Sequence, residues 1–505
     1  MKRYAWILCA WMLLGAASAY AHVGSPDVYA EGEAGPYKLY VVVRPPQAIP
    51  GIADIEVRAE SAGIHGIQIT PLPLTGEAAA HPPVPEAMKQ PSNDAQFFTG
   101  HLWIMATGSW QIRFTASGDQ GSGVLSIPVP ATAMATRTMT SGLGALLAAL
   151  GVLLVVGMVG IVGAAAREAK LAPGSDVPQR NRRSSFIAMT VTFATLVAGL
   201  VLGNAWWKSE AADYSGYIYK PLTMSAAVEN GNVLDLKLHD PGWLLQRKLD
   251  DFIPDHDHIM HLYMIRWPQM DVVFHLHPQP AMTAEFQLSL PSVPAGTYRL
   301  YADVVHKSGF PETIVGAINL PVVAGRPLAG DDAEGTGTPV VAQENNGAAG
   351  KQGAAVGHRF KLPDGYTMVW AQPAALVAKA PADFRFELLD PQGKPPQDMA
   401  LYMGMLGHAA FVKTDGTTFA HIHPTGTVSM AAFMMANPRS GMSESGATGG
   451  MDMHDMAMGP GKLPNVVGFP YGFPSAGTYR IFVQMKHGAT IETGIFDASV
   501  ENPGA

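Results

Sequence analysis

Short runs of alternating apolar and polar residues recur along the chain and predict β-strands. Residues 37–43, 52–58 and 110–115 are rich in β-branched and aromatic side chains and lie between clusters of Pro and Gly. Residues 234–238 and 284–290 alternate with a period of two, as half-buried strands do. The pattern predicts a mainly β protein with three immunoglobulin-like β-sandwich domains.

Two continuous apolar segments, residues 141–164 and 185–207, interrupt the strand pattern. Each is long enough to cross about 30 Å of hydrocarbon as a helix. The loop between them, residues 165–184, carries a group of basic side chains: Arg167, Lys170, Arg180, Arg182 and Arg183. By the positive-inside rule this loop is cytoplasmic, so the pair forms a membrane hairpin between the first and second sandwich domains.

The first 21 residues have the architecture of a cleavable export signal. Lys2 and Arg3 precede an apolar run, and small residues follow at positions 19 and 21. The sequence therefore predicts three exported regions, residues 22–138, 208–324 and 358–505. A flexible linker is expected at 325–357, and an inserted glycine-rich loop at 434–461. The expected location is the inner (cytoplasmic) membrane, with the large domains on the periplasmic side.

A repeated histidine pattern connects the second and third regions. In each copy a His precedes a His-x-His-Pro sequence, and an Ala-Gly-Thr-Tyr-Arg strand then ends on another His, ten positions after its Gly. The two quartets are His261, His275, His277, His306 and His408, His421, His423, His487. They account for eight of the seventeen histidines.

The spacing within each quartet suits a metal ion. Side chains at i and i+2 of a strand lie on one face, so two imidazoles can converge on one ion. The Pro that follows each pair predicts a position near a sheet rim open to solvent. His256 and His258 add a further pair to the second region. The alternative is that the histidines serve the fold alone, by binding backbone carbonyls.

A methionine cluster within the inserted loop favours copper over zinc. It consists of Met451, Met453, His454, Met456 and Met458. Thioethers are soft ligands that suit Cu(I), whereas three or four imidazoles suit Cu(II) or Zn(II). The only cysteine lies inside the export signal, so no thiolate competes. The alternative for this cluster is an adaptable apolar surface that binds a partner.

Composition and charge limit the remaining functions. The chain has 505 residues, 48% of them hydrophobic and 15% charged, which is too apolar for a disordered chain. Its net charge of −8 and the absence of a basic stripe give no reason to expect nucleic acid as a partner. No catalytic triad, phosphate-binding Gly loop or paired-carboxylate motif appears in its required context.

His22 would be the first residue after signal cleavage, where its α-amine and imidazole could chelate one copper ion. A β-sandwich that starts on this residue resembles the periplasmic copper carriers of copper-resistance systems and the related YtkA-FixH-like domains. The later regions resemble the histidine-rich repeats of uncharacterised bacterial envelope proteins. The copper role implied by the first resemblance extends to His22 and to residues 451–458. Three exported domains and a two-helix anchor distinguish this chain from a simple carrier.

The sequence thus predicts a membrane-anchored extracytoplasmic protein that binds copper, with zinc as the alternative ion, for tolerance or delivery. A copper-handling protein of the envelope is the expected partner. Two other hypotheses remain: a non-catalytic envelope scaffold with structural histidines, and a copper oxidase that uses His22.

Overall fold

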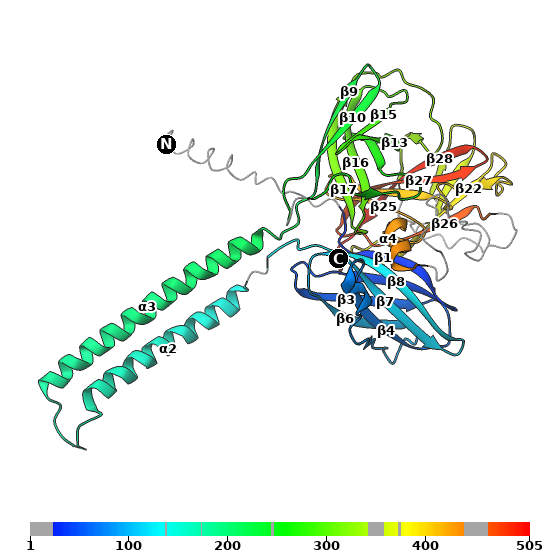
Figure 1. Ribbon diagram of the computed structural model, residues 1–505. Coiled ribbons are helices and arrows are strands. Elements are labelled where there is room, and N and C mark those ends of the chain that lie inside the picture. The colour runs from blue at the N-terminus through cyan, green and yellow to red at the C-terminus, as the bar shows by residue number, and fades with distance from the viewer. Residues whose placement is uncertain are drawn as a thin grey trace. The chain divides into compact units, whose positions relative to one another are not determined.

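The computed structural model describes residues 24–136, 139–172, 174–243, 247–341, 358–371, 375–438 and 463–504. Within these residues the protein is mainly β with two long apolar helices, as the sequence pattern predicts (Figure 1). Contacts divide the chain into two units, one formed by Met1–Thr132 with Lys220–Ala505 and the other by Ala133–Tyr219.

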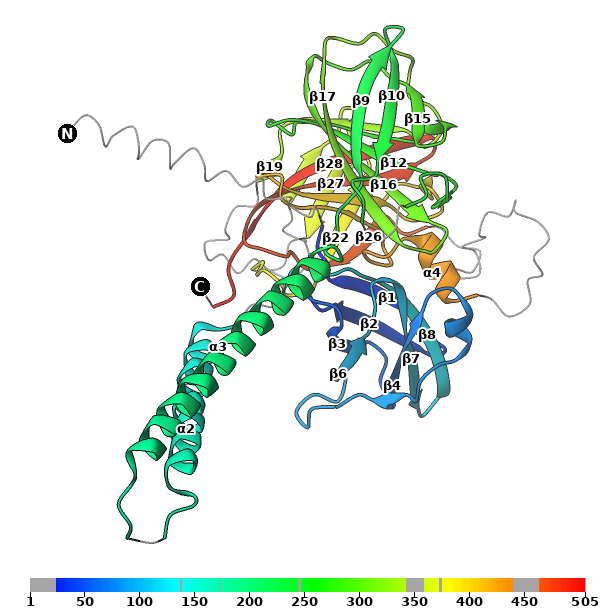
Figure 2. The ribbon, with the colours of Figure 1, turned by 60° about the vertical axis from the view of Figure 1, so that its left-hand side comes forward.

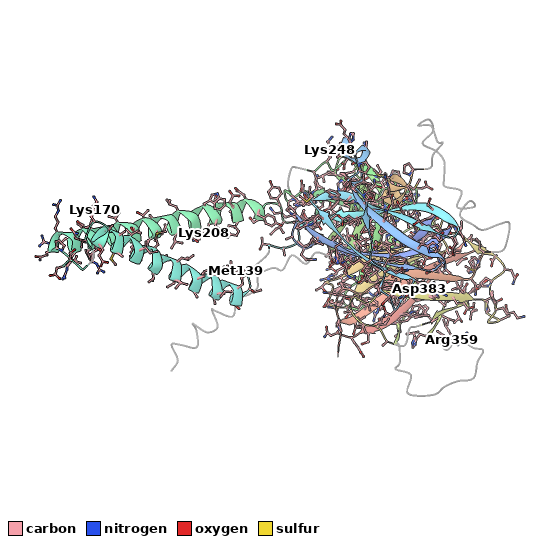
Figure 3. All side chains as sticks on the ribbon, turned by 90° about the horizontal axis from the view of Figure 1, so that it is seen from below. Met139, Lys170, Lys208, Lys248, Arg359 and Asp383 are labelled. Atoms are coloured by element: carbon pink, nitrogen blue, oxygen red, sulfur yellow. The ribbon has the colours of Figure 1, made fainter. Side chains whose placement is uncertain are left out.

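The smaller unit is a helical hairpin of α2 (Ser141–Glu168) and α3 (Gln179–Ser215). Both helices are long and apolar enough to cross a membrane, and their apolar windows are not buried inside the protein. They extend past the predicted segments, so much of the expected loop is helical. The Ser185 hydroxyl donates to the Gly163 carbonyl at 2.7 Å, next to the loop. Figure 3 shows Lys170 at this loop and Met139 at the opposite end of α2.

The first β region forms two four-stranded sheets with apolar residues between them. Tyr37, Leu39 and Val41 alternate on one strand and are fully buried, as the period-two pattern predicts. One sheet contains, in order, β1 (Val28–Ala34), β2 (Tyr37–Arg44), β3 (Gly51–Ala59) and β6 (Phe97–Ile104). The other contains β5 (Glu86–Ala87), β4 (Ile64–Pro73), β7 (Gly108–Gly118) and β8 (Gly121–Ala131), and a short 3-10 helix, η1 (Glu77–Ala80), follows β4.

The middle region differs from a separate two-sheet sandwich, because its ten strands belong to one connected sheet. The path is β14 (Gln279–Met282), β15 (Glu285–Ser289), β10 (Val233–His239), β9 (Thr223–Glu229), β17 (Pro311–Leu320), β16 (Gly296–His306), β12 (His261–Arg266), β13 (Val272–Leu276) and β18 (Ala333–Thr336), with β11 (Phe252–Ile253) beside β16. A single parallel bridge joins β17 to β9. Leu236 and Phe286 share a core with Leu262 and Phe274, so the two halves of the sheet cover each other.

The third region again has two sheets. One contains β19 (Val340–Val341), β28 (Thr490–Val500), β27 (Gly477–His487), β24 (His408–Lys413) and β25 (Phe419–Ile422), with β23 (Met399–Ala400) beside β27. The other contains β20 (His358–Lys361), β21 (Thr367–Ala371), β22 (Ala382–Leu389) and β26 (Val466–Tyr471). A short helix, α4 (Met430–Ala436), overlaps the start of the segment predicted as a loop, which corrects that boundary.

The helix α4 forms because its first turn is capped twice. The Ser429 hydroxyl accepts a hydrogen bond from the Ala432 amide at 3.3 Å, and the Asp255 carboxylate accepts one from the Ala431 amide at 2.7 Å. These contacts satisfy amides that the helix itself leaves without acceptors. Asp255 belongs to the middle region, so the second cap ties the two regions together.

The expected flexible linker is partly ordered. Strand β18 pairs with β13 of the middle region, and β19 pairs with β28 of the third region. At Gly335 in β18, a Cβ would lie 2.5 Å from the Thr493 methyl group, so glycine allows this strand to approach β28 closely. The remainder of the predicted linker, residues 342–357, lies outside the described residues.

The middle and third regions pack through equivalent sheets, and their contacts are exchanged in pairs. Arg299 of the Ala-Gly-Thr-Tyr-Arg motif donates to the Gly416 carbonyl of the third region at 3.1 Å. Its counterpart Arg480 donates to the Gln269 and Met270 carbonyls of the middle region at 2.6 and 3.0 Å. These reciprocal contacts indicate that the duplicated strands are related by an approximate two-fold axis. The strands of both regions can be followed in Figure 2, where β12 and β16 belong to the middle region and β27 and β28 to the third.

Arg480→Ala is expected to destabilise the larger unit more than Arg299→Ala. Arg480 also makes a bidentate ion pair with Asp497 at 2.7 and 2.9 Å, whereas Arg299 stacks over Trp267 at 4.1 Å. Each lost charge-assisted hydrogen bond costs about 1.5–3 kcal/mol. Thermal unfolding of both full-length variants measures the difference, and equal losses would contradict the expected ranking.

Candidate metal centre

The two His-x-His sequences face each other across the packed sheets. In β13, Phe274 and Leu276 point into the core of the middle region, so His275 occupies the opposite face. In β25, Ile422 is buried in the core of the third region, and His421 lies on the other face. His277 and His423 directly follow these strands. A one-residue change of register would turn the imidazoles away from each other.

These histidines are buried and do not line an open rim, which corrects the sequence-based expectation. His275, His277 and His423 are exposed by 0%, 4% and 3%, respectively. The prolines do end the strands, but the opposite sheet covers the strand ends. Only the packing of the two regions creates this cover, and the pattern of one strand contains no information about it.

Neighbouring strands supply His261 and His408. Residues paired with these two histidines contact the His-x-His sequence of the other region. His261 pairs with Asp303 on β16, and His408 pairs with Gln484 on β27. The Asp303 carboxylate then reaches His421 of the other region, 3.2 Å from its Nδ1. The Gln484 Oε1 likewise lies 2.8 Å from Nδ1 of His275.

A tight turn brings in His256 and His258. Its two central residues, His256 and Asp257, have φ of 49° and 67°, and Asp255 bridges to His258 across the turn. His256 lies 5.1 Å from His408 and 4.9 Å from His423, measured between ring centroids. His258 stacks on His277 at 3.8 Å.

The corresponding turn of the third region has the same shape but different side chains. Tyr402 bridges to Met405, and the central Met403 and Gly404 have φ of 49° and 76°. The Tyr402 hydroxyl lies 3.2 Å from Nδ1 of His275 and donates to the Asp331 carbonyl at 2.8 Å. The duplicated scaffold thus carries histidines in one copy and methionines in the other.

Eight imidazoles therefore form one group, which we call the histidine cluster. Its members are His256, His258, His261, His275, His277, His408, His421 and His423. Two subsets place one ligand nitrogen from each residue within 4.8 Å of the others. They are His261 with His275 and His277, and His256 with His408 and His423.

Three members have one ring nitrogen anchored and the other free. Nδ1 of His277 lies 2.9 Å from the Asp332 carboxylate, Nδ1 of His421 lies near Asp303, and Nδ1 of His423 lies 3.2 Å from the Val428 carbonyl. The Nε2 atoms of these residues have no hydrogen-bond partner within the described part of the chain. An anchored outer nitrogen with a free inner one is the usual arrangement of a metal-ligating histidine.

Two further members carry free nitrogens. His408 has neither ring nitrogen bonded, and His256 has a free Nε2, within the same described residues. Each buried polar group without a partner costs about 1–3 kcal/mol. A cation coordinated by these lone pairs would remove that cost.

Burial keeps five imidazoles of the cluster neutral. Desolvation lowers the pKa of His275 and of His423 to about 3, and neighbouring imidazoles contribute to both shifts. Desolvation also lowers the pKa of His261, His408 and His421 well below the usual range. Metal binding requires a neutral imidazole with an available lone pair. These residues meet that requirement at neutral pH.

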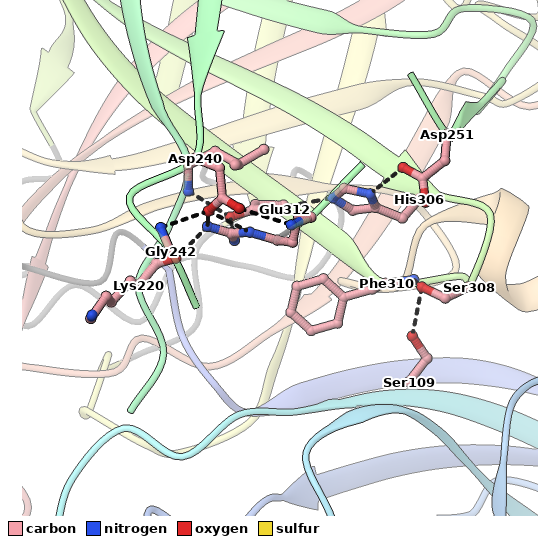
Figure 4. Close-up of polar contacts among 11 residues, drawn as sticks. Ser109, Lys220, Asp240, Gly242, Asp251, His306, Ser308, Phe310 and Glu312 are labelled. Atoms are coloured by element: carbon pink, nitrogen blue, oxygen red, sulfur yellow. Dashed lines mark hydrogen bonds and ion pairs between the residues drawn. The ribbon is translucent and has the colours of Figure 1, made fainter. Parts of the chain in front are cut away.

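The structure divides each predicted quartet, because the fourth histidine lies elsewhere. His306 contacts Asp251 at 2.7 Å and Glu312 at 3.3 Å, and Glu312 also pairs with Arg247 at 2.7 Å (Figure 4). Burial lowers the pKa of His306, but its bonds to Glu312 and Asp251 more than offset this effect and raise the pKa overall. These residues form an ion-pair network in which the Arg247 side chain supplies the positive charge.

His487 occupies the equivalent position in the third region. It lies 3.2 Å from Glu492 and stacks on Tyr366 at 4.0 Å. Asp364, His487 and Glu492 form a third group that could hold an ion. Burial and the nearby Asp364 raise the pKa of Glu492 to about 7.

The remaining sequence candidates, His22, Met451, Met453, His454, Met456 and Met458, lie outside the described residues. Sequence reasoning missed the residues that orient the imidazoles, namely Asp303, Asp332, Tyr402 and Gln484. One signal could have found two of them, because Asp303 and Gln484 each precede the strand-end histidine by three positions. In the structure Asp303 pairs with His261 across neighbouring strands, and Gln484 pairs with His408.

Comparison with known proteins assigns no activity. Residues 361–502 match a family model described as a domain of unknown function (DUF8832). No curated protein matches the chain. The similar solved structures include a bacterial ice-binding adhesin (5% identity, 93% of this chain and 100% of that chain covered, TM-score 0.15), the mouse nectin-like molecule 4 ectodomain (9%, 60% and 67%, 0.15) and Escherichia coli alpha-2-macroglobulin (11%, 94% and 35%, 0.18). TM-scores this low do not establish a shared fold with any of these proteins.

His306→Gln is expected to lower the unfolding midpoint, and to do so more at pH 6 than at pH 8. A histidine whose pKa is raised by folding stabilises the protein below its unfolded pKa of about 6.5, and this stabilisation is lost as the pH rises through the folded pKa. Thermal melts of both proteins at the two pH values measure the effect. A pH-independent difference would contradict it.

Proposed function

We propose that the protein is a membrane-anchored metal-binding protein whose histidine cluster binds copper, with zinc as the competing ion. The observation that carries the proposal is the state of the ring nitrogens in His277, His421 and His423. Each has one nitrogen held by a carboxylate or carbonyl, and a second, buried nitrogen that has no hydrogen-bond partner among the residues that the structure describes.

A purely structural role explains this arrangement less well. A histidine that only supports a fold uses its nitrogens to satisfy backbone or side-chain groups, as His306 does. His408 instead buries both ring nitrogens without a hydrogen-bond partner among the described residues. Burial without compensation is costly, and a bound cation supplies the compensation.

The donor set supports copper. The cluster offers neutral imidazole nitrogens, and the exported part of the chain contains no cysteine. Affinity of a nitrogen site for divalent ions rises to a maximum at Cu²⁺ and falls for Zn²⁺. The methionine-rich sequence at 451–458 adds soft ligands suited to Cu(I).

The hairpin and its basic loop support the proposed location. A loop with five basic residues favours the cytoplasmic side, so the β regions would lie outside the cytoplasm at the inner membrane. The proposal includes export by residues 1–21, an immunoglobulin-like character of the three β regions, and a copper-handling envelope protein as partner. Copper tolerance or delivery is the role that fits such a site.

Metal binding by the full-length protein tests the proposal. The double variant His275→Gln with His423→Gln is expected to lose most of the bound copper, because it removes one nitrogen donor from each subset. The matched control is His65→Gln with His101→Gln. These two histidines are exposed in the first region, and each lies against one aspartate, at 2.6 and 2.8 Å.

Copper titration followed by metal analysis after desalting provides the readout. The control variant should bind as much copper as the wild type. Equal copper in the cluster variant and the wild type would refute the proposal. Circular dichroism of each variant separates a lost ligand from a lost fold.

His408→Leu gives an independent test through stability. A structural histidine should destabilise the protein when replaced, whereas removal of two unsatisfied nitrogens should leave the metal-free protein about as stable or more stable. The variant should also gain less stability from added copper than the wild type, which should gain about 4 kcal/mol at 1,000 times Kd. Thermal melts with and without copper measure both effects, and a large loss in the metal-free variant would favour the structural role.

A further inference from the structure

The histidine cluster contains more ligands than one ion can use. Copper and zinc take three or four imidazoles at about 2.0–2.1 Å. Two nitrogens bound to one ion therefore lie no more than about 4.2 Å apart. The cluster has eight imidazoles, and the two subsets of three each come close to this limit, with their nitrogens within 4.8 Å.

The subsets are distinct in space. His261 and His256, one from each subset, have ring centroids 6.3 Å apart, as do His275 and His408. Within the subsets the spacings are shorter, from 4.8 Å for His275 with His277 to 5.5 Å for His261 with His275 in the first, and from 4.9 to 5.1 Å in the second. Each subset therefore has its own point of convergence.

His421 lies between the two subsets. Its ring centroid is 5.4 Å from that of His261 and 5.5 Å from that of His275, on one side. On the other side it is 5.5 Å from His408 and 4.6 Å from His423. Asp303 holds its Nδ1, and its Nε2 has no partner in the described part of the chain.

We infer that the cluster is a dinuclear centre, with one ion held by His261, His275 and His277 and a second by His256, His408 and His423. His421 is placed to complete the coordination of either ion. The inference rests on the proposed function and adds the number of ions that the cluster binds, which is two, in sites with different ligands. The two sites are partly equivalent, because His408 and His423 are the counterparts of His261 and His277, whereas the second site contains His256 where the duplication alone would place His421.

The two sites differ in how they depend on the fold. All three histidines of the first site come from the middle region. The second site takes His256 from the middle region and His408 and His423 from the third, so it exists only when the two regions are packed together. Asp255 strengthens this link, because its backbone carbonyl binds Nε2 of His261 and its carboxylate caps α4.

Stoichiometry in the full-length protein tests the inference. The background for all variants carries Met451, Met453, Met456 and Met458→Leu with His454→Ala, so that this sequence adds no ions to the count. With Cu(II) as the probe, the background protein should bind two ions that resist desalting. His277→Gln should remove the first ion and His423→Gln the second, which leaves one ion in each variant.

Electron paramagnetic resonance supplies a readout that a structural defect would not imitate. Two Cu(II) ions a few ångströms apart couple, so the doubly loaded protein should show less than the signal of two isolated ions. Each single variant should show the full signal of one ion. His101→Gln in the same background is the control and should keep two coupled ions.

The outcomes separate this inference from the proposed function. One ion in the background protein, lost in both variants, would overturn the dinuclear centre and retain the metal-binding function. Two ions with an uncoupled signal would place the second ion outside the cluster and also overturn it. No ion in the background protein would overturn both. If a variant fails to fold by circular dichroism, the count and coupling in the background protein still decide.

Discussion

The face-to-face packing of the middle and third β regions is the constraint on which the rest of the structure depends. It covers one face of β12, β13 and β16 with the equivalent face of β24, β25 and β27, and the imidazoles lie between them. Tyr301 and Phe419 stack at 4.3 Å within this contact, and both side chains are almost fully buried. Burial favours the neutral form of an imidazole, and a buried ring nitrogen that makes no hydrogen bond is costly.

Duplication within one chain builds this interface. Arg299 and Arg480 occupy equivalent positions, and each donates to a carbonyl of the other copy. Asp303 and Gln484 are also equivalent, and each contacts a histidine of the other copy. The copies are not identical, because the carboxyl group of Asp303 in one copy is replaced by the amide of Gln484 in the other. Burial raises the pKa of Asp303 to about 7, so the two halves of the centre have different electrostatic surroundings.

Divergence between the copies also separates the strand-end histidines. His306 lies in a network with Arg247, which neutralises Glu312. His487 has Asp364, Asp398 and Glu492 nearby. The same strand position thus supports a closed ion-pair network in one copy and a more acidic group in the other, because residues outside the repeated motif differ.

The sequence by itself determined the mainly β class, the two apolar helices and the pairs of histidines on one face of each strand. Local periodicity encodes these features, since alternation fixes which side chains share a face. Only the tertiary structure decided which faces meet. It merged six quartet members with His256 and His258, placed His306 and His487 elsewhere, and buried the pairs that Pro278 and Pro424 suggested were at an open rim. Contacts between strands more than a hundred residues apart leave no local pattern, so the histidine cluster could not be read from either copy alone.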